Sequence, residues 1–249
     1  MLSVTGDMLI VVAAFLAGGL VKGVTGLGLP TVAIGLLSLF MLPVKAASIL
    51  VVPSLVTNVW QTVSGPSLRP LFRRLWPMQA GIGLGAWAGS GLIISMAPEV
   101  VSAALGGALI LYAAVGLSPV RLPDVPSDAE WWIGPTSGLI TGVITAATGV
   151  FVIPLVPYLQ ALGLKRDELI QALGMSFTVS TLALAGSLAR SAVFGAELFG
   201  LSVLAIAPAL AGMVAGQWVR HAIGADVFRR WFFVALLLLG AHLVVRGIL

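Results

Sequence analysis

A lysine lies inside a long apolar stretch of the chain, among glycines and a proline that would break a helix. Lys22 stands in the stretch GGLVKGVTGLGLP, and Thr25 and Gly26 follow it by about one helical turn. Glycine and proline are poorly tolerated in a helix interior, and an unpaired charge is costly in apolar surroundings. A lysine ammonium, a threonine hydroxyl and the free N–H groups of a half-helix could together bind a small anion. The alternative is that Lys22 extends its ammonium to the nearest aqueous surface and binds no ligand.

More polar side chains follow this stretch, and others stand in the second half of the chain. Thr57, Asn58 and Gln61 fall within about one helical turn and can share a face. Gln171 and Ser176 lie in a later apolar segment. Hydroxyl and amide groups can donate hydrogen bonds to the oxygens of a sulfonate. The alternative is that these side chains connect helices to one another, as polar residues often do in membranes.

The glycine-rich motif recurs in the second half. The stretch SGLITGVITAATGVFVIP repeats the order G-L-x-x-G-V, followed by Thr148 and Gly149 and then a proline. We expect Thr148 and Gly149 to lie close to Thr25 and Gly26 near the membrane midplane. The spacing of the glycines in both copies also suits close packing of helices.

Composition indicates that these residues lie in a polytopic α-helical membrane protein. The chain has 249 residues, of which 59% are hydrophobic and 9% are charged, whereas soluble domains have about 25% charged residues. Windows of about 20 residues with few charges have the length that a membrane-spanning helix needs. The ten predicted segments are 8–25, 27–41, 46–63, 76–96, 100–118, 133–148, 150–162, 168–189, 198–219 and 227–248. The second and seventh are too short to span upright, and each could be half of a broken helix or a re-entrant piece.

Basic residues in the predicted loops orient the bundle. With ten crossings, nine of them fall on one face, which should be cytoplasmic, and both termini fall on the other. The nine are Arg69, Arg73, Arg74, Arg121, Lys165, Arg166, Arg220, Arg229 and Arg230. These loop residues account for the net charge of +4. Aromatic residues do not alternate with the arginines, so the sequence does not indicate nucleic-acid binding.

One long polar stretch divides the chain into halves. Residues 119–130, PVRLPDVPSDAE, are rich in proline and acidic residues and are predicted to form a cytoplasmic linker. Residues 1–118 and 131–249 would then be two repeats of about five segments each. Because five is odd, the second repeat would enter the membrane upside down. Inverted repeats with broken helices are typical of secondary transporters, whose substrate site lies near the midplane.

Both halves resemble the signature regions of a known family. GLVKGVTGLGLPTVAIGLLSL with MLPVKAASILVVPSLVTNVWQ looks like the first signature of the TauE/SafE family, and GLITGVITAATGVFVIPLVPYLQALGLKRDELIQALGMS looks like the second. Members are bacterial membrane permeases associated with sulfite and organosulfonate anions. The resemblance implies an inverted-repeat transporter of small sulfur-containing anions in the bacterial inner membrane, often an exporter. The second copy departs from the usual glycine cluster, with Ala146, Ala147, Val150 and Phe151 around Gly149.

The residues that enzymes and metal sites require are scarce. The chain has no cysteine and two histidines, and no carboxylate lies deep in a predicted segment. We therefore expect no enzymatic activity, no metal site, no cofactor and no carboxylate proton relay. His242, the one histidine inside a predicted segment, leaves proton coupling as an alternative. Without a nucleotide-binding loop, transport would be secondary or passive.

Residues and resemblance together predict a transporter of small sulfur-containing anions, such as sulfite or organosulfonates, that exports them by alternating access around a midplane site. The predicted substrate-binding residues are Lys22, Thr25, Gly26, Thr57, Asn58, Gln61, Thr148, Gly149, Gln171 and Ser176. The alternatives are an importer, a permease for another small anion, or a membrane scaffold that transports nothing. A homodimer through the glycine faces is a further option.

Overall fold

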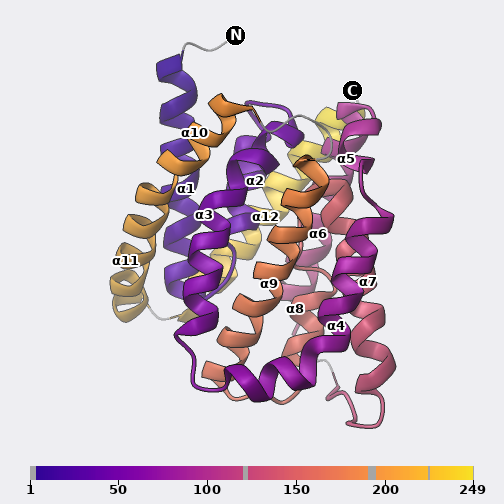
Figure 1. Cartoon of the computed structure of the whole chain (residues 1–249). Coiled ribbons are helices and arrows are strands. Elements are labelled where there is room, and N and C mark those ends of the chain that lie inside the picture. Colours follow the sequence, from indigo (N-terminus) through magenta and orange to yellow (C-terminus); the bar gives the residue numbers. More distant parts are fainter. Residues whose placement is uncertain (1–3, 120–122, 190–194, 224, 249) are drawn as a thin grey trace.

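The computed structural model describes residues 4–119, 123–189, 195–223 and 225–248, which are almost entirely helical (Figure 1). No strand occurs within these ranges. Their helices are α1 (Val4–Thr25), α2 (Leu29–Leu37), α3 (Pro43–Val63), α4 (Leu68–Ala88), α5 (Leu92–Ser95), α6 (Pro98–Leu117), α7 (Glu130–Thr148), α8 (Leu155–Gln160), α9 (Arg166–Ala189), α10 (Ala196–Leu204), α11 (Ile206–Ile223) and α12 (Ala225–Ile248). The predicted all-α fold is confirmed.

Several of these helices have the length and composition of membrane spans. Six stretches in the described part of the chain are long and apolar enough to cross a membrane. They are Gly6–Thr25, Pro43–Val63, Pro98–Leu117, Arg166–Ala189, Glu197–Arg220 and Val227–Ile248. The protein is therefore a polytopic membrane protein, as its composition predicted.

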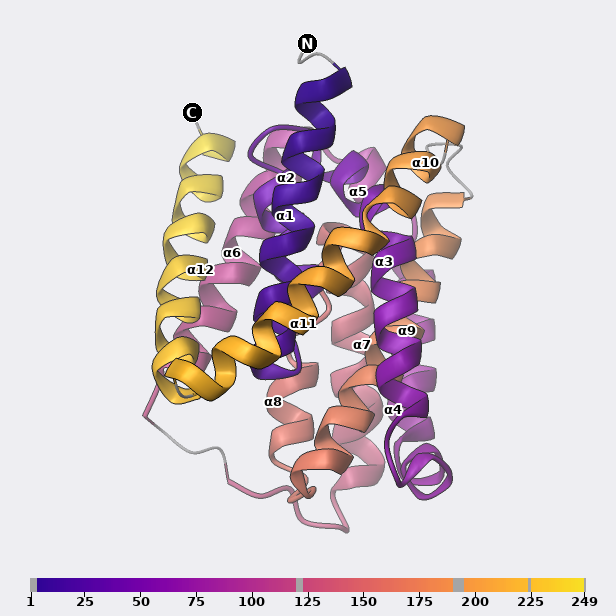
Figure 2. The same cartoon turned by 90° about the vertical axis from the view of Figure 1, so that its left-hand side faces the viewer.

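Different parts of the chain lie at the two ends of the helix bundle. The first and last helices both reach the upper end in the two views, so α1 begins and α12 ends on the same side (Figures 1 and 2). The α3–α4 and α8–α9 connections and the beginning of α7 lie at the opposite end. This arrangement fits the predicted separation of the termini from most of the basic loops.

The helices that correspond to the second and seventh predicted segments, α2 and α8, are too short to cross a membrane, as the sequence predicted. α2 has 9 residues and α8 has 6. Each follows a long helix after a short break, since α1 ends at Thr25 and α7 ends at Thr148. In both views α2 lies toward the end that carries the termini, whereas α8 lies toward the opposite end (Figures 1 and 2).

Two predicted segments have different bounds in the structure. The fourth was expected at 76–96, but α4 begins at Leu68 and ends at Ala88, before the short α5. Its first turns are charged, and hydropathy does not mark helical turns that extend beyond the apolar core. The ninth, expected at 198–219, is divided into α10 and α11. Pro208 has no N–H to donate to the carbonyl of Leu204, where α10 ends.

Glycines bring α1 into backbone contact with α11, and α7 into backbone contact with α4. A Cβ atom added at Gly23 would lie 2.2 Å from a carbonyl oxygen of α11, and one added at Gly142 would lie 2.2 Å from a carbonyl oxygen of α4. The glycines at these contacts are Gly19, Gly23, Gly212 and Gly216 between α1 and α11, and Gly81, Gly85, Gly138 and Gly142 between α4 and α7. Their predicted packing role is confirmed. Because they face each other within one chain, they give no support to a homodimer.

A proline inside α3 is accommodated by a side chain of α10. Pro53 cannot donate the hydrogen bond that the carbonyl of Ile49 would accept in a regular helix. The hydroxyl of Ser202 donates to this carbonyl at 2.7 Å and accepts the N–H of Val52 at 3.1 Å. The backbone groups freed by the proline are thus satisfied inside the bundle, as membrane-embedded helices require.

Candidate functional site

The break between α1 and α2 is built by a threonine followed by a glycine. The hydroxyl of Thr25 donates to the carbonyl of Val21 at 2.8 Å and accepts the N–H of Leu27 at 3.2 Å. Gly26 has φ 81°, a left-handed conformation that ends helices and that glycine adopts without strain. The Thr25 hydroxyl is therefore engaged with its own backbone.

The break after α7 repeats this local geometry. The hydroxyl of Thr148 donates to the carbonyl of Ile144 at 2.7 Å and accepts the N–H of Val150 at 3.1 Å. Gly149 has φ 74°. The recurrence of Thr-Gly in the sequence thus has a structural reason, because both pairs terminate a long helix in the same way.

Lys22 is buried between α1 and α3. Its side chain is 2% exposed, so it does not reach an aqueous surface. Its Nζ donates to the hydroxyl of Thr57 at 3.1 Å and to the side-chain oxygen of Asn58. Asn58 in turn donates to the hydroxyl of Ser54 at 3.0 Å, and this hydroxyl lies 3.2 Å from that of Thr181 in α9. Three helices are connected through these side chains, and each acceptor of Lys22 is neutral.

The two predicted glutamines bind backbone groups at the contact between α3 and α9. Gln61 donates to the carbonyl of Gly26 at 3.0 Å and to that of Ile170 at 2.7 Å. Gln171 donates to the carbonyl of Thr62 at 2.7 Å and accepts the N–H of Ser67 at 2.8 Å. Gln61 therefore connects the first break directly to α9.

Ser176 belongs to a separate contact. Its hydroxyl donates to the carbonyl of Ala172 at 2.9 Å and accepts a hydrogen bond from Gln79 of α4 at 2.9 Å. The sequence reasoning did not single out Gln79. The feature of the sequence that could have identified Gln79 is that it is the one amide in a segment otherwise made of small, apolar and basic residues.

A cavity of about 890 Å³ lies beside the first break. Its lining extends from Thr25 across α6, α8, α9 and α12 to the linker, where it includes Asp124. Arg166 and Arg229, at the beginnings of α9 and α12, also line it. Of the ten predicted site residues, only Thr25 is among the lining residues. The cavity therefore reaches the break without reaching Lys22.

The second break is packed, in contrast to the first. A Cβ atom added at Gly149 would lie 2.3 Å from Cδ1 of Ile34, whereas one added at Gly26 would lie 3.4 Å from Ile170. Thr148 is 3% exposed and Val150 is 1% exposed. The two breaks thus share a backbone geometry but have different surroundings.

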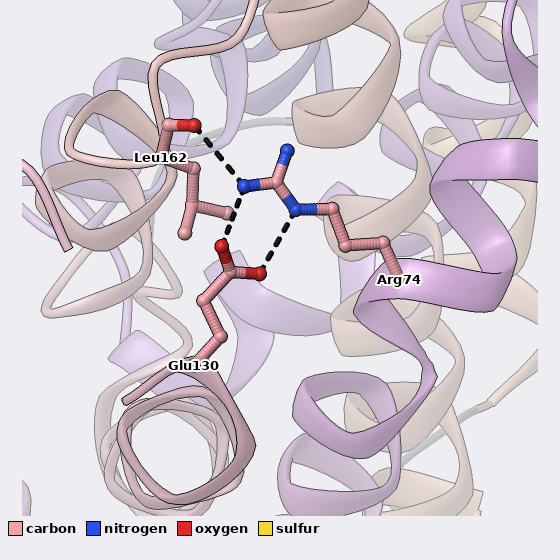
Figure 3. Close-up of polar contacts among 3 residues, drawn as sticks. All are labelled: Arg74, Glu130 and Leu162. Atoms are coloured by element: carbon pink, nitrogen blue, oxygen red, sulfur yellow. Dashed lines mark hydrogen bonds and ion pairs between the residues drawn. The ribbon is translucent and has the colours of Figure 1, made fainter. Parts of the chain in front are cut away.

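An arginine from another helix donates to a carbonyl just beyond the C-terminal end of α2, and a second arginine does so just beyond α8. Arg74 of α4 forms an ion pair with Glu130 at 2.6 Å and also donates to the carbonyl of Leu162, just beyond α8 (Figure 3). The hydrogen bond to Glu130 raises the pKa of Arg74. At the other end of the bundle, Arg246 donates to the carbonyl of Leu39, just beyond α2, at 2.6 Å. Cations are favourable at helix C-termini, so both contacts hold a short helix in place.

Potential metal ligands do not gather at one place in the described residues. No cluster of three or more His, Asp or Glu side chains occurs in that part of the chain. The polar residues assembled around the breaks are instead hydroxyls, amides and one lysine, which suit hydrogen bonding to an anion.

The sequence matches a family model over almost its whole length. The model is described as Sulfite exporter TauE/SafE, and the match covers residues 10–243. No curated protein and no solved structure matches the chain. The match includes both breaks, the Lys22 contacts and the helices that line the cavity.

Proposed function

Because the chain belongs to the sulfite exporter TauE/SafE family of membrane transporters, we propose that it exports small sulfur-containing anions such as sulfite or organosulfonates. Transport is secondary or passive and takes place in the bacterial inner membrane. The observation that carries this proposal is the cavity that leads from a basic end of the bundle to the break after α1.

The charges around the cavity favour an anion. Its charged lining residues are Arg166, Arg229 and Asp124, a formal excess of one positive charge. The arginines lie near the ends of helices whose connections carry further basic residues. Under the positive-inside rule this end faces the cytoplasm, so the cavity would receive an anion from inside the cell.

The two halves would exchange roles during transport. As inverted repeats over residues 1–118 and 131–249, joined by the linker 119–130, they would each supply one Thr-Gly break. The support is the matching of contacts, since α1 packs on α11 as α7 packs on α4, and both pairs use two glycines from each helix. A cavity at the first break and tight packing at the second correspond to one state. The outward-facing state would open the second break and close the first.

Lys22 supplies the positive charge of the proposed midplane site. It has two neutral acceptors, Thr57 and Asn58, and no carboxylate partner among the described residues. An anion that reached this depth would be attracted to it and could replace one of the two acceptors. Gln61 would couple the binding of an anion to a movement of α9, because its amide donates hydrogen bonds to the carbonyl of Gly26 in the first break and to that of Ile170 in α9.

The membrane potential favours export without another coupled ion. Moving one negative charge out of a cell that is negative inside is favourable by about 2.3 kcal/mol per 100 mV. We therefore propose export as the direction of transport. An importer, or a permease for a different small anion, would use the same cavity.

The test is anion flux in proteoliposomes that contain the purified protein. Labelled sulfite and methanesulfonate should leave protein-containing vesicles faster than protein-free vesicles, and an imposed potential, negative inside, should accelerate the efflux. Equal efflux from both kinds of vesicle would refute transport and would favour the scaffold alternative. Flux of chloride or phosphate but not of the sulfur anions would refute the substrate class alone.

A further inference from the structure

An open groove lies on the outer surface of the bundle, where α4 packs on α7. Its volume is about 380 Å³ and its lining is almost entirely apolar. The lining includes Trp76, Ala80 and Leu84 of α4 and Pro135, Thr136 and Leu139 of α7. A water molecule takes up about 30 Å³ in the liquid, so the groove has room for a much larger apolar group.

Small residues form the floor of this groove. A Cβ atom added at Gly81 would lie 2.3 Å from the carbonyl oxygen of Pro135, so the two helices meet there through their backbones. Ala80, the preceding residue of α4, is exposed and lines the groove. Trp76 and Leu84, one turn to either side of Ala80, are exposed and large. The groove stays open because α4 places no large side chain between these two.

The groove lies at membrane depth. Both of its helices pack against α9, which is long and apolar enough to cross a membrane. Leu84 and Leu139 are exposed on its walls, where acyl chains surround a membrane protein. Trp76 lies toward the end at which α4 and α7 begin, and Trp131 and Trp132 are exposed in the first turn of α7. Tryptophans gather at the membrane–water interface, so these three mark the level at which head groups give way to acyl chains.

Two arginines stand at the polar end of the groove. Arg69 and Arg73 precede Trp76 by seven and three residues, spacings that place all three on one side of a helix. Both arginines are exposed, and neither takes part in an ion pair in the part of the chain that the structure describes. The carboxylate of Glu130 is already paired with the next arginine, Arg74. The two guanidinium groups are therefore available to an anion from the surroundings.

The first turns of α4 are oriented to present these arginines to the membrane surface. They lie across the lower end of the bundle, whereas the rest of α4 rises beside α7 (Figures 1 and 2). Pro77 stands inside α4, and a proline inside a helix produces a bend of this kind. Arg69 and Arg73 belong to the first turns, and the groove extends from Trp76 toward the hydrocarbon.

We propose that the groove between α4 and α7 binds an anionic phospholipid, such as phosphatidylglycerol: Arg69 and Arg73 bind the phosphate, and an acyl chain lies over Ala80. Guanidinium groups form paired hydrogen bonds with phosphate oxygens, and basic residues near the surface attract anionic lipids. A zwitterionic lipid offers the same chains, but brings a cation close to the arginines. The inference goes beyond the transport of anions and does not depend on which anion is carried.

The first test measures quenching of tryptophan fluorescence by lipids with brominated acyl chains, with the purified full-length protein in nanodiscs. The contribution of Trp76 is obtained by difference from Trp76→Phe. Brominated phosphatidylglycerol should quench Trp76 at a mole fraction about fivefold lower than brominated phosphatidylcholine, the selectivity that one basic residue near a membrane surface gives. Trp218, exposed on α11 and outside the groove, should be quenched equally by both lipids. Equal quenching of Trp76 by both lipids would overturn the proposal.

The second test removes the head-group contacts. A double variant, Arg69→Gln with Arg73→Gln, should lose most of the preference of Trp76 for phosphatidylglycerol, while quenching by phosphatidylcholine stays the same. Arg230→Gln, at an exposed position of α12 outside the groove, should leave the preference unchanged. A double variant with the full preference of the unmodified protein would contradict the role of the two arginines.

The third test fills the groove. Ala80→Leu places a larger side chain on its floor, so quenching of Trp76 by both lipids should decrease. Ala88→Leu, at an exposed position of the same helix outside the lining, is the control. Melting temperatures show whether both variants are folded. Equal quenching in the two variants would show that no acyl chain occupies the groove.

Soluble anions distinguish the whole lipid from its head group. Inorganic phosphate and glycerol phosphate lack the acyl chain, so neither should displace brominated phosphatidylglycerol from Trp76 at the ionic strength of a matched sodium chloride control. Displacement by phosphate beyond that of the salt control would indicate an anion site formed by the arginines alone and would overturn the lipid assignment.

Discussion

The Nζ of Lys22 lies 3.1 Å from the hydroxyl oxygen of Thr57, a residue 35 positions later in the chain. Asn58 provides a second acceptor on the same helix. Both are neutral, and the one ion pair within the described residues joins Arg74 to Glu130. A lysine at membrane depth costs roughly 2.5–3.5 kcal/mol on insertion scales. This arrangement leaves its charge available to an anion.

Removing the charge of Lys22 should therefore reduce anion affinity. We expect Lys22→Met to weaken sulfite or methanesulfonate binding at least tenfold, or about 1.4 kcal/mol. Lys22→Arg should be intermediate, because a guanidinium is not a point charge. The measurement is concentration-dependent flux in proteoliposomes. Lys45→Met, at an exposed lysine near the start of α3, is the control, and equal affinities in the Lys22 and Lys45 variants would exclude Lys22 from the site.

Adding a negative charge beside Lys22 should have the same effect. Asn58→Asp is nearly isosteric and would give Lys22 a carboxylate partner in place of the amide oxygen. The new ion pair would neutralise the lysine within the bundle, so anion affinity should fall about as much as in Lys22→Met. Flux and melting temperature should be measured together. A stable Asn58→Asp protein with normal affinity would show that the lysine charge is not used for transport.

Gly149 should tolerate no side chain. Gly149→Ala places a residue in the left-handed region, which costs about 1–3 kcal/mol, and its Cβ would lie 2.3 Å from Cδ1 of Ile34. We expect a lower melting temperature in detergent. Ile34→Val removes this Cδ1 atom, so the double variant should recover part of the loss. Gly83→Ala, where an added Cβ meets no atom within 4 Å, should be neutral. A Gly149→Ala protein as stable as Gly83→Ala would contradict the observed packing.

The glycine contacts of the two halves should be energetically similar. Gly23→Ala in α1 and Gly142→Ala in α7 each place a methyl group 2.2 Å from a carbonyl oxygen of the opposing helix. We expect each to destabilise the protein by about 1–3 kcal/mol through overpacking. Gly107→Ala, in open space on α6, serves as the control. Loss of stability in one variant alone would argue against equivalent roles of the two helix pairs.

The orientation of the bundle can be tested on a single helix. Leu42 and Ser64 flank α3 and are both exposed. Because the chain has no native cysteine, an impermeant thiol reagent should label Leu42→Cys, but not Ser64→Cys, on intact cells. Inverted membrane vesicles should reverse this pattern. Labelling of Ser64→Cys alone from outside would reverse the proposed orientation and place the cavity on the outer side.

Features that depend on neighbouring residues were predictable from the sequence. Apolar windows identified a membrane protein, and the Thr-Gly pairs at 25–26 and 148–149 marked the ends of α1 and α7. A threonine hydroxyl that bonds within two to four residues and a glycine with positive φ end a helix without help from the rest of the fold. Glycines four residues apart likewise indicated close helix packing, although the sequence did not identify the partner helix.

Features that depend on the rotation and pairing of helices came from the tertiary structure. Lys22 and Thr25 stand one turn apart, yet Lys22 bonds α3 whereas Thr25 lines the cavity. The cavity itself combines α6, α8, α9 and α12, including Tyr112 and Phe233, which the sequence did not single out. The sequence pattern and the composition of a helix depend only on the residues of that helix. Which side chain of another helix it meets is set by long-range packing, because apolar helices in a membrane have many similar faces and only close contacts discriminate between them.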